Sequence, residues 1–162
     1  MSFYRKASEQ KLELSELRVA AINLLSRREY SRHEIFQKLS PRAQDQDELQ
    51  QVLNRLEELG YQSDQRFAES FLRSRIYRGL GKNRIVRELK EKGIGSRLAE
   101  SAIESESPDW FELAKESGMN KAHSLDLKDY TDRQKFFRYL SYRGFATDEI
   151  KFALEELALT ED

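Results

Sequence analysis

Apolar residues recur along the chain at the spacing of three and four residues that is typical of amphipathic helices. In the clearest run, apolar side chains stand at positions i, i+3, i+4, i+7 and i+8, namely Leu17, Ala20, Ala21, Leu24 and Leu25. Similar runs occupy residues 49–59, 67–72 and 150–157, with shorter ones between them. The pattern predicts roughly nine helices, each with one apolar face that a neighbour must cover.

Residues that begin or end helices separate these runs. Three glycines follow helical runs and are expected in the left-handed conformation that closes a helix: Gly60, Gly93 and Gly144. Two pairs fit the capping box, in which side chains satisfy free N–H groups of the first turn: Ser31 with Glu34, and Thr131 with Gln134. Ser107, followed by Pro108, predicts another helix start with a capping hydroxyl. We expect residues 41–47 and 121–130 to be connecting loops.

One helix–turn–helix segment is repeated. Residues 25–35 match residues 140–150 without a gap, and the two copies share an arginine, an aromatic residue and a Glu-Ile pair. A looser copy lies in residues 72–89, with an insertion that carries Gly79 and Gly81. With their companion helices, the copies predict three tandem three-helix modules, at residues 1–61, 62–106 and 107–162. One module alone buries too little apolar surface to be stable, so we expect neighbouring modules to share an interface.

Composition agrees with this architecture. The chain has only seven glycines and two prolines in 162 residues, which argues against a many-stranded β fold. Charged residues make up 35%, which favours a body with much surface for its volume, so we expect an all-α, elongated helical repeat. The lack of cysteine excludes disulfides and cysteine-ligated metals. Since no apolar stretch is long enough for a signal peptide or a membrane span, we expect a cytoplasmic protein without membrane contact.

The net charge of −1 conceals an uneven distribution. Residues 62–100 hold ten basic and five acidic residues, whereas residues 101–162 hold eight basic and fourteen acidic ones. The basic segment is the best candidate for a binding surface, because guanidinium groups pair with carboxylates of a protein or with phosphates. The candidate partner-binding residues are Arg66, Arg73, Arg75, Arg78, Lys82, Arg84, Arg87 and Lys90. For any one of them, an ordinary solvated helix face is the alternative interpretation.

No part of the sequence forms the pattern of a catalytic or metal site. Residues 79–83 contain two glycines and a lysine, but they lack the spacing and the preceding strand of a phosphate-binding loop. His33 and His123 have no partners at metal-ligand spacing. The sequence therefore predicts a binding protein without cofactor or metal, and not an enzyme. Aromatic residues at the corners, among them Tyr77, Tyr142 and Phe145, are expected to be core or corner residues rather than base-stacking platforms.

The motifs at these helix ends resemble those of the RecX family, regulatory proteins that act on the RecA recombinase. In chain order they are AINLLSRREYS at 21–31, LGYQSDQRFA at 59–68, RIYRGLG at 75–81 and FRYLSYRGF at 137–145. The resemblance covers residues 15–157. Two positions depart from the family pattern: Gln62 stands where an aliphatic residue is usual, and Arg78 replaces a more usual lysine. The acidic third module argues against DNA contact at that end.

The resemblance implies a regulator of RecA, mainly an inhibitor. Members of this family bind in the groove of the RecA–DNA filament and restrain strand exchange, ATP hydrolysis and co-protease activity, and so act on recombination, DNA repair and the SOS response. The implied partner is the RecA filament, with a weak direct DNA contact as an addition, and we expect a monomer. From the residues alone two other interpretations stay open: a helix-turn-helix-like protein that binds DNA directly, and a helical adaptor with another partner.

Overall fold

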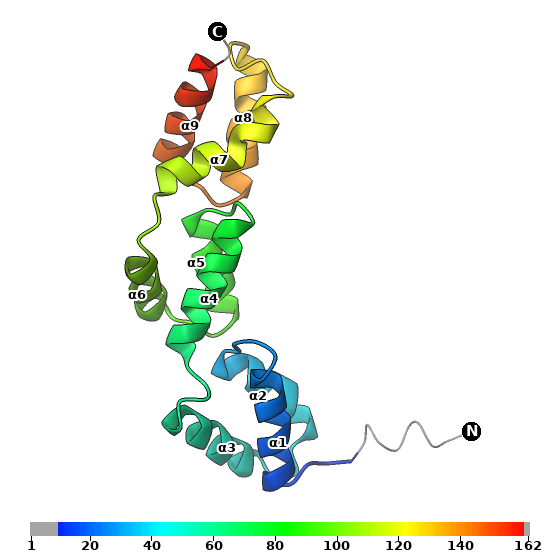
Figure 1. Cartoon of the computed structure of the whole chain (residues 1–162). Coiled ribbons are helices and arrows are strands. Elements are labelled where there is room, and N and C mark those ends of the chain that lie inside the picture. The colour runs from blue at the N-terminus through cyan, green and yellow to red at the C-terminus, as the bar shows by residue number, and fades with distance from the viewer. Residues whose placement is uncertain (1–9, 161–162) are drawn as a thin grey trace, which may run out of the picture. The chain divides into compact units, whose positions relative to one another are not determined.

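The computed structural model describes residues 10–160 of the chain. These residues form nine α-helices, one short 3₁₀ helix and no β-strand, so the all-α prediction is confirmed (Figure 1). In chain order the helices are α1 (Leu14–Leu25), α2 (Arg32–Leu39), η1 (Ser40–Arg42), α3 (Gln46–Glu58), α4 (Asp64–Tyr77), α5 (Lys82–Glu91), α6 (Ser96–Glu106), α7 (Trp110–Ala122), α8 (Tyr130–Tyr142) and α9 (Thr147–Leu159).

The helices belong to two compact units. Unit 1 comprises the residues up to Ala68 together with Lys92–Ile94, and therefore contains α1, α2, η1, α3, the start of α4 and the α5–α6 turn. Unit 2 comprises Glu69–Glu91 and the residues from Gly95 onward, which include the rest of α4 and the helices from α5 to α9. The α5–α6 turn thus packs with the first three helices rather than with the helices that it joins.

Unit 1 is held together by a core that α1, α2 and α3 share. The buried side chains are Leu17, Ala21, Tyr30, Ile35, Leu39, Ala43, Leu49, Val52, Leu53 and Leu56. Leu17 and Leu49 are completely buried, as the three- and four-residue spacing predicts. Deleting either side chain to alanine would cost about 2–5 kcal/mol, because the closely packed helices collapse only partly onto the cavity.

The expected loop after residue 40 is shorter than the sequence indicated. Residues Ser40–Arg42 form the turn η1, and α3 begins at Gln46 with Asp45 as its N-cap. The Asp45 carboxylate accepts a hydrogen bond of 2.8 Å from the backbone N–H of Asp47. Leu12 pairs with Ala43 in an isolated β-bridge, which ties the segment before α1 to this turn.

In unit 2, α7, α8 and α9 enclose a second core (Figure 1). Its buried side chains are Ala114, Ala122, Leu127, Phe136, Leu140, Phe145, Ile150, Ala153 and Leu157. Gly118 on α7 lies directly against the ring of Phe136, where an added Cβ would stand 2.7 Å from the ring. The absence of a side chain at Gly118 therefore permits the close approach of α7 to α8.

Two predicted helix starts are wrong, while the predicted helix ends are right. Thr131 lies inside α8, which begins one residue earlier and is capped by Asp129, because the Asp129 carboxylate accepts from the backbone N–H of Asp132. Ser107 ends α6 instead of starting α7, and Asp109 is the N-cap of α7. Both helices use an aspartate because its carboxylate accepts the free N–H groups of a first turn strongly. The expected left-handed glycines are confirmed: Gly60, Gly93 and Gly144.

Candidate interaction surface

Helix α5 has one apolar face and one cationic face. Ile85 and Leu89 are fully buried. Arg87 and Lys90 stand three residues apart on the opposite side of the helix, and both are exposed. Neither side chain has an ion-pair partner among the described residues. Arg78, in the turn before α5, is also exposed and without an ion pair in this part of the chain.

The other five predicted site residues are engaged in ion pairs. The N···O distances are 3.0 Å for Arg66 with Glu29, 2.5 Å for Arg73 with Glu106, 3.5 Å for Arg75 with Glu88, 3.5 Å for Lys82 with Glu100 and 4.0 Å for Arg84 with Glu88. Arg66 makes its pair within unit 1, whereas the other four belong to unit 2. Such pairs at a surface contribute about 0–1 kcal/mol to stability, but they reduce the positive charge available to a partner.

Arg75 has a structural role. Its side chain is 20% exposed, and its guanidinium lies 4.2 Å from the centre of the Phe71 ring. Glu88 lies between Arg75 and Arg84 and neutralises part of both charges. Glu29 and Glu106 lie outside residues 62–100, and Glu88 pairs with two arginines. The number of charged residues in this segment therefore overstates the positive charge that is available to a partner.

Two exposed tyrosines end helices of unit 2, and one of them, Tyr142, lies close to Arg84. Tyr77, at the end of α4, is 93% exposed, and Tyr142, at the end of α8, is 75% exposed. The guanidinium of Arg84 lies 5.2 Å from the centre of the Tyr142 ring, within reach of a cation–π contact. Of the expected core or corner residues, Phe145 is buried in the core, whereas Tyr77 and Tyr142 stand at corners with their rings in solvent. The helical spacing could not separate them, because all three residues flank turns.

Arg143 holds the turn before α5 in place. Its guanidinium donates to the carbonyl oxygens of Gly79 and Arg78, and to Ser117 Oγ at 3.1 Å. In return, the N–H of Gly81 donates a 2.8 Å hydrogen bond to the carbonyl oxygen of Arg143. The backbone that carries Arg78 is therefore fixed, while its side chain stays in solvent.

A comparable arrangement occurs in unit 1, where the α5–α6 turn packs on the start of α2. The Ser31 hydroxyl donates a 2.7 Å hydrogen bond to the carbonyl oxygen of Lys92 and accepts from the backbone N–H of Glu34. Gly93 lies against the Cβ of His33, so an added side chain would collide there. The predicted capping box of Ser31 with Glu34 is confirmed, and its serine also holds a turn that is distant in sequence.

The carboxylate of Glu34 forms ion pairs with two cations at this contact. Its carboxylate lies 3.1 Å from the guanidinium of Arg28 and 3.4 Å from the ammonium of Lys92. Partial burial raises the pKa of Glu34, but hydrogen bonds from Arg28 and from the backbone N–H of Ser31 lower it. The positive charges of Arg28 and Lys92 lower it further. The net result is a pKa of Glu34 below its ordinary value, so the carboxylate is ionised when the chain is folded at neutral pH.

Gln62, which departs from the pattern noted in the sequence, is buried beside this contact. Its amide nitrogen donates to the carbonyl oxygen of Tyr30 at 3.2 Å and to Asp64 at 2.9 Å. The Asp64 carboxylate also accepts from the backbone N–H of Arg32 at 2.9 Å. The polar side chain therefore links α4 to the start of α2 through hydrogen bonds that an aliphatic side chain could not form.

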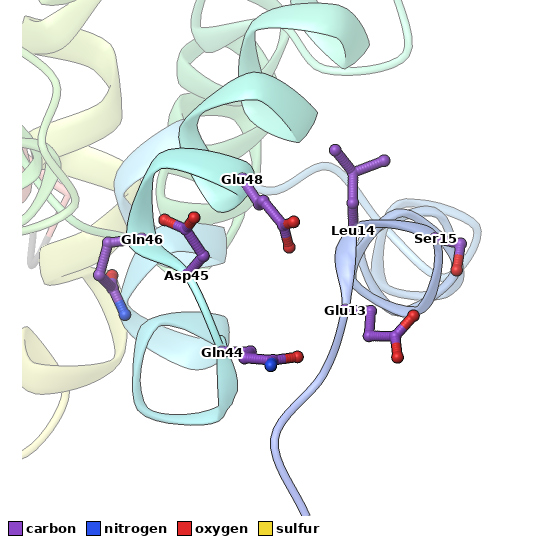
Figure 2. Close-up of a pocket in the computed structure, with 7 residues that line it drawn as sticks. All are labelled: Glu13, Leu14, Ser15, Gln44, Asp45, Gln46 and Glu48. Carbon is purple, nitrogen blue, oxygen red and sulfur yellow. The ribbon is translucent and has the colours of Figure 1, made fainter.

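The pocket between the starts of α1 and α3 is acidic. Figure 2 shows its lining, in which Glu13, Asp45 and Glu48 contribute carboxylates. Asp45 is the N-cap of α3, so its carboxylate is engaged in a hydrogen bond with the first turn of that helix. Across the described residues, no three His, Asp or Glu side chains gather closely enough to hold a metal ion. Within the same part of the chain, every helix is too short or too polar to cross a membrane.

Comparison with known proteins finds relatives that match most of the chain. Family models described as the first, second and third three-helix domains of RecX match residues 18–56, 63–103 and 108–154. The chain is 36% identical to the regulatory protein RecX of Vibrio campbellii over 147 residues, which are 90% of this chain and 95% of that protein. It is 40% identical to regulatory protein RecX of Chromohalobacter salexigens over 134 residues, 83% of this chain and 88% of that one.

Similarity extends to the three-dimensional structure. The crystal structure of RecX from Lactobacillus salivarius matches with a TM-score of 0.77 and 28% identity, over 90% of this chain and 97% of that one. The all-α helical-repeat fold of this chain therefore agrees with both the matches to three RecX three-helix domains and the likeness to a solved RecX structure.

Proposed function

Because the chain belongs to the RecX family of regulatory proteins, we propose that it regulates the RecA recombinase by binding in the groove of the RecA–DNA filament. Bound there, it restrains strand exchange, ATP hydrolysis and co-protease activity, and so limits recombination and the SOS response. The observation that carries this proposal is the match of all three modules, in order, to RecX three-helix domains. The chain acts by binding as a cytoplasmic monomer and catalyses no reaction of its own.

The exposed cations of unit 2 support a contact with the filament. Arg78, Arg87 and Lys90 are exposed and have no ion pair among the described residues, so they lose no internal contact when they bind a partner. A RecA–DNA filament offers phosphates and protein carboxylates, and both are suited to guanidinium and ammonium groups. We therefore assign the filament contact to these three of the eight predicted residues, and a supporting role to the ion-paired five.

The test is a measurement of ATP turnover by active RecA filaments on single-stranded DNA. The protein should suppress turnover, and the triple variant Arg78→Glu, Arg87→Glu, Lys90→Glu should need about tenfold or more protein for the same effect. The matched control reverses three exposed cations of the third module that also lack ion pairs, Arg133, Arg138 and Lys151. Undiminished turnover over a wide range of protein concentration would contradict the assigned role. Equal weakening by both variants would contradict the assigned surface.

A second candidate is direct binding of DNA, which the exposed Tyr77 and Tyr142 favour. Aromatic rings beside arginines are typical of surfaces that bind single strands, where bases stack on the rings and cations contact the phosphates. Titration of single-stranded and duplex DNA at two salt concentrations, in the absence of RecA, separates the two candidates. Tight binding that weakens steeply with salt would favour DNA as the primary partner.

A further inference from the structure

Helix α1 carries apolar side chains on both of its faces. Its inner face supplies Leu17 and Ala21, which are completely buried in the core of unit 1. Its outer face carries Val19 and Ile22, which are 58% and 40% exposed. Residues three apart lie one above the other on a helix, so Val19 and Ile22 form one apolar stripe. A helix that is apolar on both faces is normally covered on both, and residues 10–160 leave the outer face of α1 uncovered.

A groove runs beside this stripe. Two depressions, of about 410 and 350 Å³, lie along α1 and adjoin, since Ala20, Asn23 and Arg42 line both of them. Val19 forms part of the wall of one, and Leu24 part of the wall of the other. The groove therefore follows α1 for more than one helical turn, with apolar side chains along the α1 side.

The opposite edge of the groove, supplied by α2 and η1, is cationic. Lys38 and Arg42 line it, and both are exposed. Neither forms an ion pair with a residue that the structure describes. Among the described residues that line the groove, Glu16 carries the one carboxylate, which accepts a hydrogen bond from the backbone N–H of Glu13 and so caps α1. The groove thus combines an apolar wall with an unneutralised positive edge.

We propose that this groove is a docking site for an amphipathic helix of a partner protein that carries carboxylates along one edge of its apolar stripe. The stripe packs against Val19, Ala20 and Leu24, and the carboxylates pair with Lys38 and Arg42. In helix-in-groove recognition an amphipathic helix lays its apolar face into an apolar channel, and charges of opposite sign at the rim add specificity. Nucleic acid is disfavoured, because phosphates gain nothing from an apolar wall. The site lies in unit 1 and does not depend on the filament contact assigned to unit 2.

The probes are helical peptides stabilised by a hydrocarbon staple. A panel varies leucine, isoleucine and phenylalanine along the apolar stripe, and each peptide is made once with glutamates and once with lysines on its edge. Binding is followed by NMR on the full chain with isotope-labelled methyl groups. We expect glutamate-edged peptides to shift the methyl signals of Val19, Ala20 and Leu24. Their affinity should fall by about tenfold as salt is raised, because the ion pairs are at the surface.

Charge reversals in the protein test the cationic edge. Lys38→Glu and Arg42→Glu should each weaken the glutamate-edged peptides severalfold and improve the lysine-edged ones. The control Arg55→Glu makes the same charge change on α3 of unit 1, away from the groove, and should leave both kinds of peptide unaffected. Circular dichroism checks that all three variants keep their helices.

Three outcomes would overturn the proposal. The first is that no glutamate-edged peptide shifts the groove signals. The second is that lysine-edged peptides shift them equally, since the positive edge would then have no selective role. The third is that the groove signals shift with protein concentration in the absence of peptide, because a second copy of the chain would then be the occupant.

Discussion

Ser31 and Lys92 are 61 residues apart in the sequence, and the hydroxyl of Ser31 donates a 2.7 Å hydrogen bond to the carbonyl oxygen of Lys92. The same hydroxyl accepts from the backbone N–H of Glu34, so one side chain both begins α2 and holds the α5–α6 turn. Ser31 is completely buried, so removing its side chain leaves a buried donor and a buried acceptor without their partner.

Replacing Ser31 by alanine should therefore lower the free energy of unfolding by about 2 kcal/mol, from the lost cap and the unpaired carbonyl together. Urea denaturation followed by circular dichroism measures the effect. Ser26→Ala is the control, because the exposed Ser26 hydroxyl at the end of α1 donates to the nearby carbonyl oxygen of Asn23 and bonds to nothing else in the described chain. If the two variants lost equal stability, the contact with Lys92 would contribute nothing.

The ionised Glu34 makes the stability of unit 1 dependent on pH. Its pKa is lowered in the folded chain, so its contribution is fully present above the ordinary pKa of a glutamate, about 4.3, and is lost as the pH falls through the lowered value. The wild-type chain and Glu34→Gln should therefore differ in stability at pH 7, and the difference should shrink as the pH falls through the lowered pKa of Glu34. Denaturation curves at several pH values measure this difference. A difference that persisted unchanged at low pH would contradict the role given to the Glu34 charge.

Gly144 should tolerate no side chain. Its φ is +102°, and an added Cβ would stand 2.4 Å from the Cβ of Arg84. Gly144→Ala should cost about 3 kcal/mol or more, from backbone strain and collision together. Gly60 has a φ of +77° and open space around it, so Gly60→Ala should cost only about 1–2 kcal/mol. Thermal unfolding of the two variants separates the effect of backbone strain alone, in Gly60→Ala, from that of strain with a steric collision, in Gly144→Ala. A smaller loss of stability in Gly144→Ala than in Gly60→Ala would refute the packing argument.

Arg75 and Arg87 should have opposite roles although both belong to the basic segment. Arg75→Ala removes the contact with Phe71 and leaves Glu88 with a weaker pair, so it should cost about 1–2 kcal/mol of stability. Arg87→Ala should stay within about 0.5 kcal/mol, because Arg87 is exposed and without an ion pair in the described chain. Urea denaturation ranks the two for stability. Co-sedimentation with RecA filaments should rank them in the reverse order for binding.

The candidate site was only partly predictable from the sequence. Charge along the chain identified the basic segment, but it could not show that Glu88 neutralises Arg75 and Arg84 together, or that Glu106 reaches Arg73 from another helix. Likewise, helical spacing could not distinguish the exposed Tyr142 from the buried Phe145, since the two residues flank the same turn. Ion pairing and exposure depend on residues that meet only after helices pack.

The sequence by itself determined the all-α fold, the number of helices and the glycines that end them, because apolar spacing and the conformational freedom of glycine act over a few neighbouring residues. Over residues 10–160, the tertiary structure decided which cations have no ion pair, that Ser31 is buried, and where the apolar face of α1 is left uncovered. These features arise from contacts between residues far apart in the chain, such as Ser31 with Lys92 and Arg143 with Gly79. No local pattern specifies such contacts, because they form only when one helix end packs against a distant turn.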